Sequence, residues 1–293
     1  MADWYKKFKQ GIPAKTLFKK SSSEDVARKC PKCSQKIQKD ALAKNFFSCH
    51  CGYHFRISSA EYFDFLFDNS QSVELFSYLS LQDERDFQDI IPYPERILIA
   101  KNKSGVKESI SIAQGKLFSI EVIIAVMDFS FIGGTLGTVM GEKLSKAIEK
   151  CIHGRIPLIV ISRSGGARLM ESIFALMQMT KISARLNELT EAGIPFISVM
   201  TDPTIGGVTA AVGMRGDINI AEPNALIAYT APKVLRESIG KEPPKGFQRS
   251  EFVFDNGFID LIVSRDLLKG HIANFLTLVL NENSVTERTI AQT

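Results

Sequence analysis

Apolar runs and amphipathic stretches alternate along the last two thirds of the chain. Phe118–Phe129, Ile156–Ser162 and Phe196–Thr201 are rich in Ile and Val, and the last two predict strands buried on both faces. Between them, Val139–Ile152 and Arg168–Leu189 carry apolar residues at helical spacing. Strands that alternate with helices in this way indicate an α/β domain with mainly parallel pairing.

Weaker patterns predict the remaining elements of this domain. Ile110–Gln114 is expected to form a strand that turns at Gly115-Lys116 into the next strand. The other expected elements are the strands Ala225–Tyr229 and Phe258–Val263 and the helices Glu61–Phe67, Pro232–Ile239, Glu251–Asn256 and Leu267–Asn281. The stretch Ser70–Asp89 has a mixed pattern that does not distinguish between helix, strand and loop.

The helix expected at Arg168–Leu189 has apolar positions around most of its circumference. Such a helix is expected to be deeply packed, because no wide polar face is left for solvent. We interpret its methionines Met170, Met177 and Met179 as side chains that fill gaps in the core.

Three glycine pairs each follow an apolar run and precede a helical one. They are Ile132-Gly133-Gly134-Thr135, Ser164-Gly165-Gly166-Ala167 and Ile205-Gly206-Gly207-Val208. A strand that ends in two glycines lets a ligand approach the backbone closely, since no Cβ stands in the way. The following helix supplies free N–H groups and the positive end of its dipole. Such a corner can hold a phosphate or the negative oxygen of an enolate.

Four of the five cysteines lie close together as Cys30-Pro31-Lys32-Cys33 and Cys49-His50-Cys51. Two pairs of thiolates on tight turns match the tetrahedral ligand set of a closed, structural Zn²⁺ site. The second pair has one intervening residue, which is shorter than the usual spacing. The sequence therefore leaves open whether Cys49 is a ligand or is replaced by His50 or His54.

Charge is distributed unevenly along the 293 residues. Residues 1–60 hold 13 Lys/Arg and 4 Asp/Glu, a net charge of +9. The remainder holds 23 Lys/Arg and 28 Asp/Glu, a net charge of −5, and the two parts add to the total of +4. The basic first fifth suits nucleic acid, an acidic partner or an anionic ligand, or is a solvated tail. No apolar run reaches the roughly 18 residues of a membrane span, and the N-terminus lacks a secretory signal, so we expect a cytoplasmic protein.

Five sequence segments, taken together, carry a specific resemblance. They are Phe129–Gly137, Ser164–Glu171, Thr201–Val208, Asn219–Pro223 and Pro244–Phe252. In this order they closely resemble the bacterial and plastid β subunit of the acetyl-coenzyme A carboxylase carboxyltransferase, over most of the chain. The resemblance implies a crotonase-like spiral of ββα units preceded by a small zinc ribbon. It divides the chain into a basic, flexible N-terminus (1–29), the zinc ribbon (30–57) and the crotonase-like domain (58–293).

The same resemblance implies half of an active site. The family's β subunit binds acetyl-coenzyme A, while an α subunit provides the pocket for carboxybiotin on its carrier protein, within an α₂β₂ assembly. The product is malonyl-coenzyme A, for fatty acid synthesis. Backbone amides suit this chemistry, because carboxyl transfer passes through an enolate whose oxygen needs hydrogen-bond donors. The proton of the acetyl methyl group can go to the biotin anion, so no protein base is required.

Carried over to this sequence, the resemblance assigns roles to individual residues. The amides of Gly206 and Gly207 are expected to form the oxyanion hole. The residues expected to line the coenzyme A arm are Gly133, Gly134, Gly165, Gly166, Ala167 and Arg168. Arg168 is a candidate for an anionic ligand or for a structural carboxylate, and Glu171 is the nearest carboxylate in sequence. Cys30, Cys33, Cys49 and Cys51 are the expected zinc ligands.

Two other functions are compatible with parts of the sequence. A self-contained crotonase-type acyl-coenzyme A enzyme would need a positioned acid or base. The histidines lie outside the three glycine motifs, and only Glu171 is a carboxylate that suits this role. A nucleic-acid-binding protein would use the zinc ribbon and the basic N-terminus, which leaves the other four-fifths of the chain without a purpose.

Overall fold

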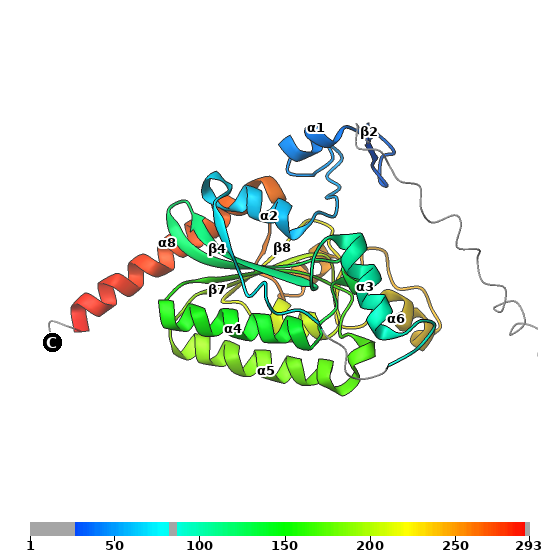
Figure 1. The fold of residues 1–293 in the computed structure, drawn as a ribbon. Coiled ribbons are helices and arrows are strands. Elements are labelled where there is room, and N and C mark those ends of the chain that lie inside the picture. The colour runs from blue at the N-terminus through cyan, green and yellow to red at the C-terminus, as the bar shows by residue number, and fades with distance from the viewer. Residues whose placement is uncertain (1–26, 82–86, 291–293) are drawn as a thin grey trace, which may run out of the picture.

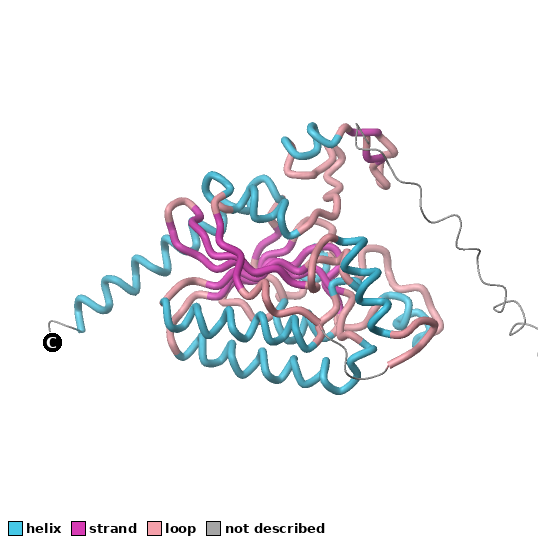
Figure 2. Tube along the Cα trace, in the orientation of Figure 1, coloured by secondary structure: helices cyan, strands magenta, loops and turns pink. Residues whose placement is uncertain are grey.

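The computed structural model describes residues 27–81 and 87–290, and Figure 1 shows their arrangement. A central sheet has helices on both faces, and the cysteine-containing module lies to one side of it (Figures 1 and 2). Most of the predicted flexible N-terminus lies outside the described residues.

Eight strands of the described chain form the central sheet, in the order β10-β8-β7-β6-β5-β4-β3, with β9 paired to β7. They are β3 (Ser72–Leu75), β4 (Ile110–Leu117), β5 (Ile120–Met127), β6 (Leu158–Ser164), β7 (Phe196–Ile205), β8 (Ile218–Ala221), β9 (Ile227–Ala228) and β10 (Leu261–Ile262). The strands from β5 through β6, β7 and β8 to β10 pair in parallel, whereas β3, β4 and β5 are antiparallel. The sheet therefore has the α/β character and the mainly parallel pairing that the sequence predicts.

Helices cover the sheet because its strands are apolar on both faces. The helices are α1 (Lys39–Lys44), α2 (Ser59–Leu66), α3 (Tyr93–Ser104), α4 (Thr138–Gly154), α5 (Ser172–Glu191), α6 (Pro232–Ile239), α7 (Ser250–Asp255) and α8 (Arg265–Ile290). Alternate residues of β5 face opposite layers: Ile123 and Ala125 pack with α4 and α5, while Ile124 and Val126 pack with α2 and α8. No helix of the described residues is long and apolar enough to cross a membrane.

The cysteine module begins with a small antiparallel pair, β1 (Arg28–Lys29) and β2 (Lys36–Ile37), followed by α1. Its apolar side chains Phe47, Phe55 and Ile57 belong to the same buried cluster as α2 and one face of the sheet. The module is thus packed against the core rather than attached by a free linker.

Gly115 does not form the turn that the sequence predicts. It lies inside β4, and the turn to β5 is made by Phe118 and Ser119, both with positive φ. A Cβ built on Gly115 would lie 2.6 Å from Cδ1 of Phe67 and 2.8 Å from the carbonyl oxygen of Gln71. This glycine is therefore explained by close packing within a strand.

The prediction for Arg168–Leu189 is wrong in two respects. The α-helix begins only at Ser172, after a single 3₁₀ turn at Leu169–Glu171. The helix is also not deeply packed: Phe174 and Met177 are about half exposed, at 48% and 59%. Its inner side is buried on α4 and the sheet, whereas part of its outer side is apolar and faces solvent.

The helix α3 was not expected from the sequence, and neither was the short helix α1 of the cysteine module. In α3 the apolar residues Ile97, Leu98 and Ile99 are consecutive, and only the first is buried. The buried residues Tyr93, Ile97 and Ala100 do follow a helical period, but the exposed Leu98 and Ile99 beside Ile97 obscure it in the sequence. The strands expected at Ala225–Tyr229 and Phe258–Val263 are present but shorter than predicted.

Candidate functional site

The three glycine pairs lie side by side where β5, β6 and β7 end. The amide of Gly165 donates to the carbonyl of Gly133 at 2.9 Å, which joins the first pair to the second. A Cβ built on Gly206 would lie 3.0 Å from Cα of Gly166, so the second and third pairs are in direct contact. The three pairs form one continuous stretch of backbone, here named the glycine layer.

Glycine is required in this layer for both conformation and space. Gly134 has φ of 63°, and a Cβ on it would lie 2.2 Å from the carbonyl oxygen of Arg163. Gly206 has φ of 70°, in the left-handed region that L side chains rarely adopt. The close approach of these three backbone segments therefore depends on residues without side chains.

The two amides of the third pair have different surroundings. The amide of Gly206 donates to the carbonyl of Ala228 at 3.0 Å, next to the pairing of β7 with β9. The amide of Gly207 has no hydrogen-bond acceptor in the part of the chain that the structure describes, and it opens the helical turn after β7. Of the two amides predicted to form the oxyanion hole, the sheet already uses that of Gly206.

A second amide without an acceptor lies in the second pair. The amide of Gly166 donates to Oγ of Ser164 at 3.0 Å. That of the next residue, Ala167, has no acceptor among the described residues. Gly166 touches Gly206, and β6 and β7 are parallel, so Ala167 and Gly207 are the corresponding next residues of two neighbouring strands. The glycine layer thus presents two free amides from two different strands.

Arg168 is buried and is held in the interior by two carboxylates. Its Nη1 is 2.9 Å from Oε1 of Glu171, and its Nη2 contacts Oε1 of Glu108. Burial would lower the pKa of Arg168, but the two carboxylates raise it above its usual value. A Cβ on Gly137 would lie 2.6 Å from Oε1 of Glu171, so this glycine makes room for the pair. Of the two roles considered for Arg168, its side chain takes the structural one.

The four clustered cysteines come together in the module. Their sulfur atoms all lie within 4.8 Å of one another, with Cys30 and Cys51 at 3.6 Å and Cys33 and Cys49 at 3.5 Å. Four thiolates around a Zn²⁺ ion at about 2.3 Å would have similar separations. The short C-x-C spacing does not exclude Cys49, whereas His50 lies outside the set with Nδ1 at 3.4 Å from Cys49 Sγ. The cluster could hold a metal ion.

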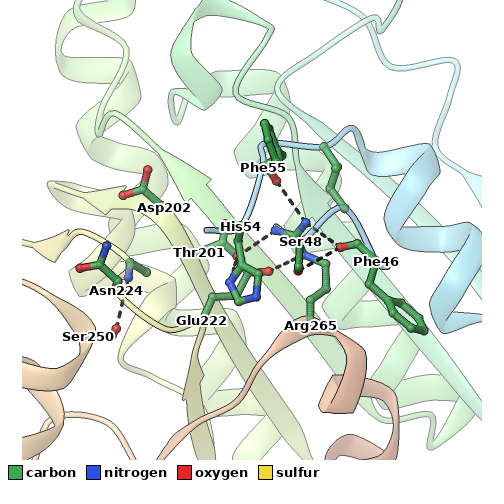
Figure 3. A network of polar contacts seen from close by, with 12 residues as sticks. Phe46, Ser48, His54, Phe55, Thr201, Asp202, Glu222, Asn224, Ser250 and Arg265 are labelled. Carbon is green, nitrogen blue, oxygen red and sulfur yellow. Dashed lines mark hydrogen bonds and ion pairs between the residues drawn. The ribbon is translucent and has the colours of Figure 1, made fainter. Parts of the chain in front are cut away.

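Arg265 connects the cysteine module to the core through hydrogen bonds, as Figure 3 shows. Its Nη1 donates to the carbonyls of Phe46 and Phe55 at 3.2 and 3.1 Å. Its Nε and Nη2 donate to the two carboxylate oxygens of Glu222 at 2.7 and 2.9 Å. Burial opposes ionisation of Glu222, but Arg265 outweighs it and lowers the pKa of this carboxyl to about 2. A fully buried ion pair therefore bridges the two parts of the protein.

A second arginine makes a similar bridge directly before the glycine layer. Arg163 donates from Nη1 to the carbonyl of Ile57 at 2.8 Å and from Nε to Oγ1 of Thr201 at 3.1 Å. Its Nη2 reaches the hydroxyl of Tyr62 at 3.3 Å. Arg163 belongs to β6 and immediately precedes the second glycine motif, so the end of the module is tied to the backbone of the site.

His54 does not join the cysteine cluster. Its Nδ1 lies 3.8 Å from Oε2 of Glu222, in the same network as Arg265 (Figure 3). Burial lowers the pKa of His54, which favours the neutral imidazole at this position. The alternative in which His54 replaces a cysteine ligand is therefore not the one that the structure adopts.

An apolar surface borders the glycine layer at the start of α5. Its exposed side chains are Leu169, Ile173, Phe174, Leu176 and Met177. The same helix contacts the layer through Met179, whose sulfur would lie 2.6 Å from a Cβ built on Gly207. We name these five exposed residues the α5 face. Contiguous exposed apolar residues of this kind mark interaction surfaces.

Sequence reasoning missed most of the buried ionic groups around the site. Glu222 and Arg265 lie 43 positions apart, and Glu108 lies 60 positions from Arg168. Glu222 is part of the segment Asn219–Pro223, whose resemblance gave no role to this carboxylate. For Glu222 one signal was available: it stands between Ala221 and Pro223, and a charged residue among apolar neighbours is buried only with a partner.

Comparisons with known proteins agree with this architecture. Residues 88–288 match the model of the carboxyl transferase domain family. The chain is 47% identical over 279 residues to the acetyl-coenzyme A carboxylase carboxyl transferase subunit beta of Pedobacter heparinus, with 95% of this chain and 99% of the relative covered. The subunit of the same name in Chlorobaculum tepidum is 47% identical over 271 residues, which cover 92% of this chain and 98% of that relative.

Solved structures with this fold are also carboxyl-group enzymes by name. Transcarboxylase 12S, solved with methylmalonyl-coenzyme A, has a TM-score of 0.63 at 20% identity over 75% of this chain and 41% of its own. A malonate decarboxylase hetero-tetramer from Pseudomonas has a TM-score of 0.63 at 20% identity. The match covers 75% of this chain and 82% of the decarboxylase chain. The fold and the matched family model define a crotonase-like carboxyl transferase. Within that class, the chain belongs to the family of acetyl-coenzyme A carboxylase carboxyl transferase β subunits.

Proposed function

We propose that this chain binds acetyl-coenzyme A and, together with an α subunit, transfers a carboxyl group to it from carboxybiotin on a carrier protein. The product is malonyl-coenzyme A. The observation that carries this proposal is the pair of free amides at Ala167 and Gly207, at the ends of adjacent parallel strands. The names of the relatives supply the acyl group and the reaction, carboxyl transfer. The resemblance supplies carboxybiotin as the donor.

The two amides act on the thioester oxygen of the substrate. Loss of a proton from the acetyl methyl group converts the thioester to an enolate, whose oxygen gains negative charge. Amides fixed in advance stabilise this charge, and one lost donor typically costs about 2.7–4 kcal/mol of transition-state stabilisation. Compared with the pair expected from the sequence, Ala167 takes the place of Gly206, because the amide of Gly206 is bonded to Ala228. Gly206 retains a role because its turn orients the amide N–H of Gly207.

The remaining glycines give the substrate arm access to these amides. Gly133, Gly134, Gly165 and Gly166 keep side chains away from the layer, so we propose that the pantetheine arm runs along them. Arg168 contributes by holding Glu171 and Glu108 rather than by touching substrate. Its ion pairs fix the turn that follows Ala167.

We propose that the α5 face binds the α subunit, in the α₂β₂ assembly implied by the family. The face adjoins the glycine layer through Met179, so a partner docked there would cover the site. Malonate decarboxylase from Pseudomonas, which shares the fold, was crystallised as a hetero-tetramer. Free carboxybiotin carrier would then reach the thioester from the partner's side.

We propose that the four cysteines hold one structural Zn²⁺ ion. Four thiolates fill its coordination and leave no position for a substrate, so the metal would stabilise the fold of the module. Such thiolates persist in a reducing compartment, which supports the expected cytoplasmic location.

The decisive test removes one amide without removing the surrounding packing. Gly207→Pro deletes the N–H at the first position of a helical turn, where proline is well accommodated. Because a side chain at this position meets Met179, the change is made in a Met179→Ala background. The matched control, Gly207→Ala with Met179→Ala, adds a Cβ but keeps the amide.

Malonyl-coenzyme A formation is measured with acetyl-coenzyme A and carboxybiotin carrier, first with this chain alone and then with the α subunit. We expect turnover only in the mixture, and a fall in kcat of about 10²–10³ for the proline variant relative to its control. Turnover of an acyl-coenzyme A by the chain alone would support the self-contained enzyme instead. Equal activity of the two variants would show that Gly207 is not a donor.

A further inference from the structure

A basic pocket of about 320 Å³ lies at the joint between the cysteine module and the core. Its lining includes Arg28, Arg56, Lys103, Phe129, Ser130 and Arg163. We infer that this pocket binds the phosphate groups of coenzyme A. The inference rests on the proposed function for the choice of ligand, and it adds a role for the module in substrate binding.

The pocket has an excess of positive charge that its own acids do not neutralise. Four cationic side chains line it, against the carboxylates of Glu61 and Asp128. Glu61 is engaged in the capping box of α2, where it accepts from the amide and the hydroxyl of Ser58. Asp128 accepts from the hydroxyl of Ser130 at 2.6 Å and from the amide of Ser59 at 3.2 Å. Both carboxylates are therefore satisfied without the arginines.

Arg56 is the residue best placed to receive a phosphate. Its guanidinium lies over the ring of Phe129 at 4.4 Å, which fixes its orientation, and the side chain is half exposed. Among the described residues its one ion pair is with Asp202, at 3.6 Å. An arginine held over a ring in this way keeps further N–H donors for two oxygens of a phosphate.

Arg28 and Lys103 add charge from two other parts of the chain. Arg28 lies on β1 and donates to the carbonyl of Arg56 at 3.4 Å, so it belongs to the same corner of the module. Lys103 lies in the last turn of α3 and is exposed. Among the described residues, neither side chain forms an ion pair. Three cations from β1, the end of the module and α3 thus converge on one pocket.

The pocket is continuous with the glycine layer. Cα of Phe129 would lie 3.3 Å from a Cβ built on Gly134, and Arg163 also touches that position. Asp202, which contacts Arg56, precedes Gly207 by five residues, so at most about 18 Å of chain separates them. Coenzyme A has its reactive sulfur at one end of an extended arm and its phosphates at the other. The layer and the pocket provide a site for each end.

Neighbouring cavities suit the phosphates less well. The cavity beside Tyr229, Phe252 and Phe258 has no charged residue in its lining. The one beside Lys107 and Lys143 also contains Glu74 and Glu108, which offset those two cations. Of these three cavities in the described part of the chain, the pocket at the joint combines net positive charge with contact to the glycine layer.

The test compares ligands that differ in phosphate content, using calorimetry on the full chain. The ligands are coenzyme A, 3′-dephospho-coenzyme A and pantetheine. The variants are Arg56→Ala and the double change Arg28→Ala with Lys103→Ala, and the control is Lys116→Ala, an exposed cation on β4 outside the pocket. We expect Arg56→Ala to weaken coenzyme A binding by at least about tenfold, since hydrogen bonds to charged groups are strong. Pantetheine binding should be unchanged in every variant.

Two outcomes would overturn the inference. In one, the variants bind coenzyme A as the unmodified chain does, or lose pantetheine to the same extent. In the other, the variants lose the binding of a single-stranded RNA but keep the binding of coenzyme A. That result would assign the pocket to nucleic acid. The test does not depend on turnover: the proline variant at Gly207 should lose activity and still bind coenzyme A. A failure of the proposed function would therefore be seen separately from a failure of the pocket.

Discussion

Arg265 and Glu222 form a buried ion pair with two parallel hydrogen bonds, of 2.7 and 2.9 Å. The same guanidinium donates to the carbonyls of Phe46 and Phe55 in the cysteine module. Glu222 also accepts from the hydroxyl of Tyr62 at 2.9 Å. One charged network thus holds the module, α2 and the sheet together.

Replacing Glu222 with Gln should strongly destabilise the protein. The change leaves Arg265 buried without a full counter-charge, and breaking a buried pair in this way typically costs about 3–5 kcal/mol. The exposed pair of Lys233 and Glu237 is the control, since Glu237→Gln should cost at most about 1 kcal/mol. Urea unfolding measures both variants. If both variants lost a similar free energy of unfolding, the buried pair would contribute no more to stability than the exposed one.

The same carboxylate should make the stability depend on acidic pH. The pKa of Glu222 is about 2 in the folded protein, against about 4.3 for an unfolded chain. Because the folded pKa is the lower one, the stabilisation is complete above about pH 5 and is lost as the pH falls toward 2. The free energy of unfolding measured between pH 6 and 3 should fall more steeply for the unmodified protein than for Glu222→Gln. Parallel curves would contradict this account.

Local patterns predicted the parts of the site that depend on local geometry. The second and third glycine pairs directly follow the ends of β6 and β7, as predicted, whereas the first lies in a 3₁₀ turn some residues after β5. An apolar run followed by two glycines and a helical stretch is visible within about ten residues. The partner of Arg168 at Glu171 was also visible, three positions away. Glu108 was not, since only the folded sheet brings it to Arg168. Likewise the amide of Gly206 was expected to be free, because its acceptor Ala228 comes from a strand 22 residues later.

The prediction for α5 failed for a different physical reason. Apolar residues around a helix were taken to mean burial within one chain. Phe174 and Met177 are instead exposed, while Ile182 and Leu186 further along the same helix are buried. A subunit that leaves part of its core for a partner has the same apolar pattern as a self-contained protein. Sequence alone could not distinguish the two arrangements.

Removing the metal expected at the cysteine cluster should loosen the module. Four thiolates within 4.8 Å of one another repel when ionised, and a bound Zn²⁺ ion removes that repulsion. We expect about one zinc per chain by elemental analysis and a lower melting temperature after chelation. Cys33→Ser should reduce the zinc content, whereas Cys151→Ser, at a buried cysteine outside the cluster, should not. Full zinc content in Cys33→Ser would contradict the assigned ligands.

The ion pairs of Arg168 should be sensitive to the space at Gly137. A Cβ there would lie 2.6 Å from Oε1 of Glu171 and 2.9 Å from Cζ of Arg168, so Gly137→Ala must displace the pair. We expect this variant to unfold at a lower urea concentration and to lose activity, because the pair fixes the turn after Ala167. Gly270→Ala is the control, since nothing lies within 4 Å of a Cβ at that position. Equal stability of the two variants would show that the pair tolerates displacement.

The α5 face gives the most direct test of the subunit arrangement. Ile173→Ser with Met177→Ser makes this face polar and leaves the inner side of the helix, with Ile182, untouched. If the face binds the α subunit, the double variant should remain folded but fail to co-elute with that subunit. Leu278→Ser is the control, because it removes an equally exposed apolar side chain from α8.

Activity provides the second readout of the same variants. Because a partner on the α5 face would complete the site at the glycine layer, malonyl-coenzyme A formation should fall in proportion to the lost complex and return at high α-subunit concentration. The affinity of the isolated chain for coenzyme A should stay unchanged, since the face is separate from the glycine layer's free amides. A double variant that assembles normally would show that the α subunit binds elsewhere, and the exposed apolar residues of α5 would then need another partner.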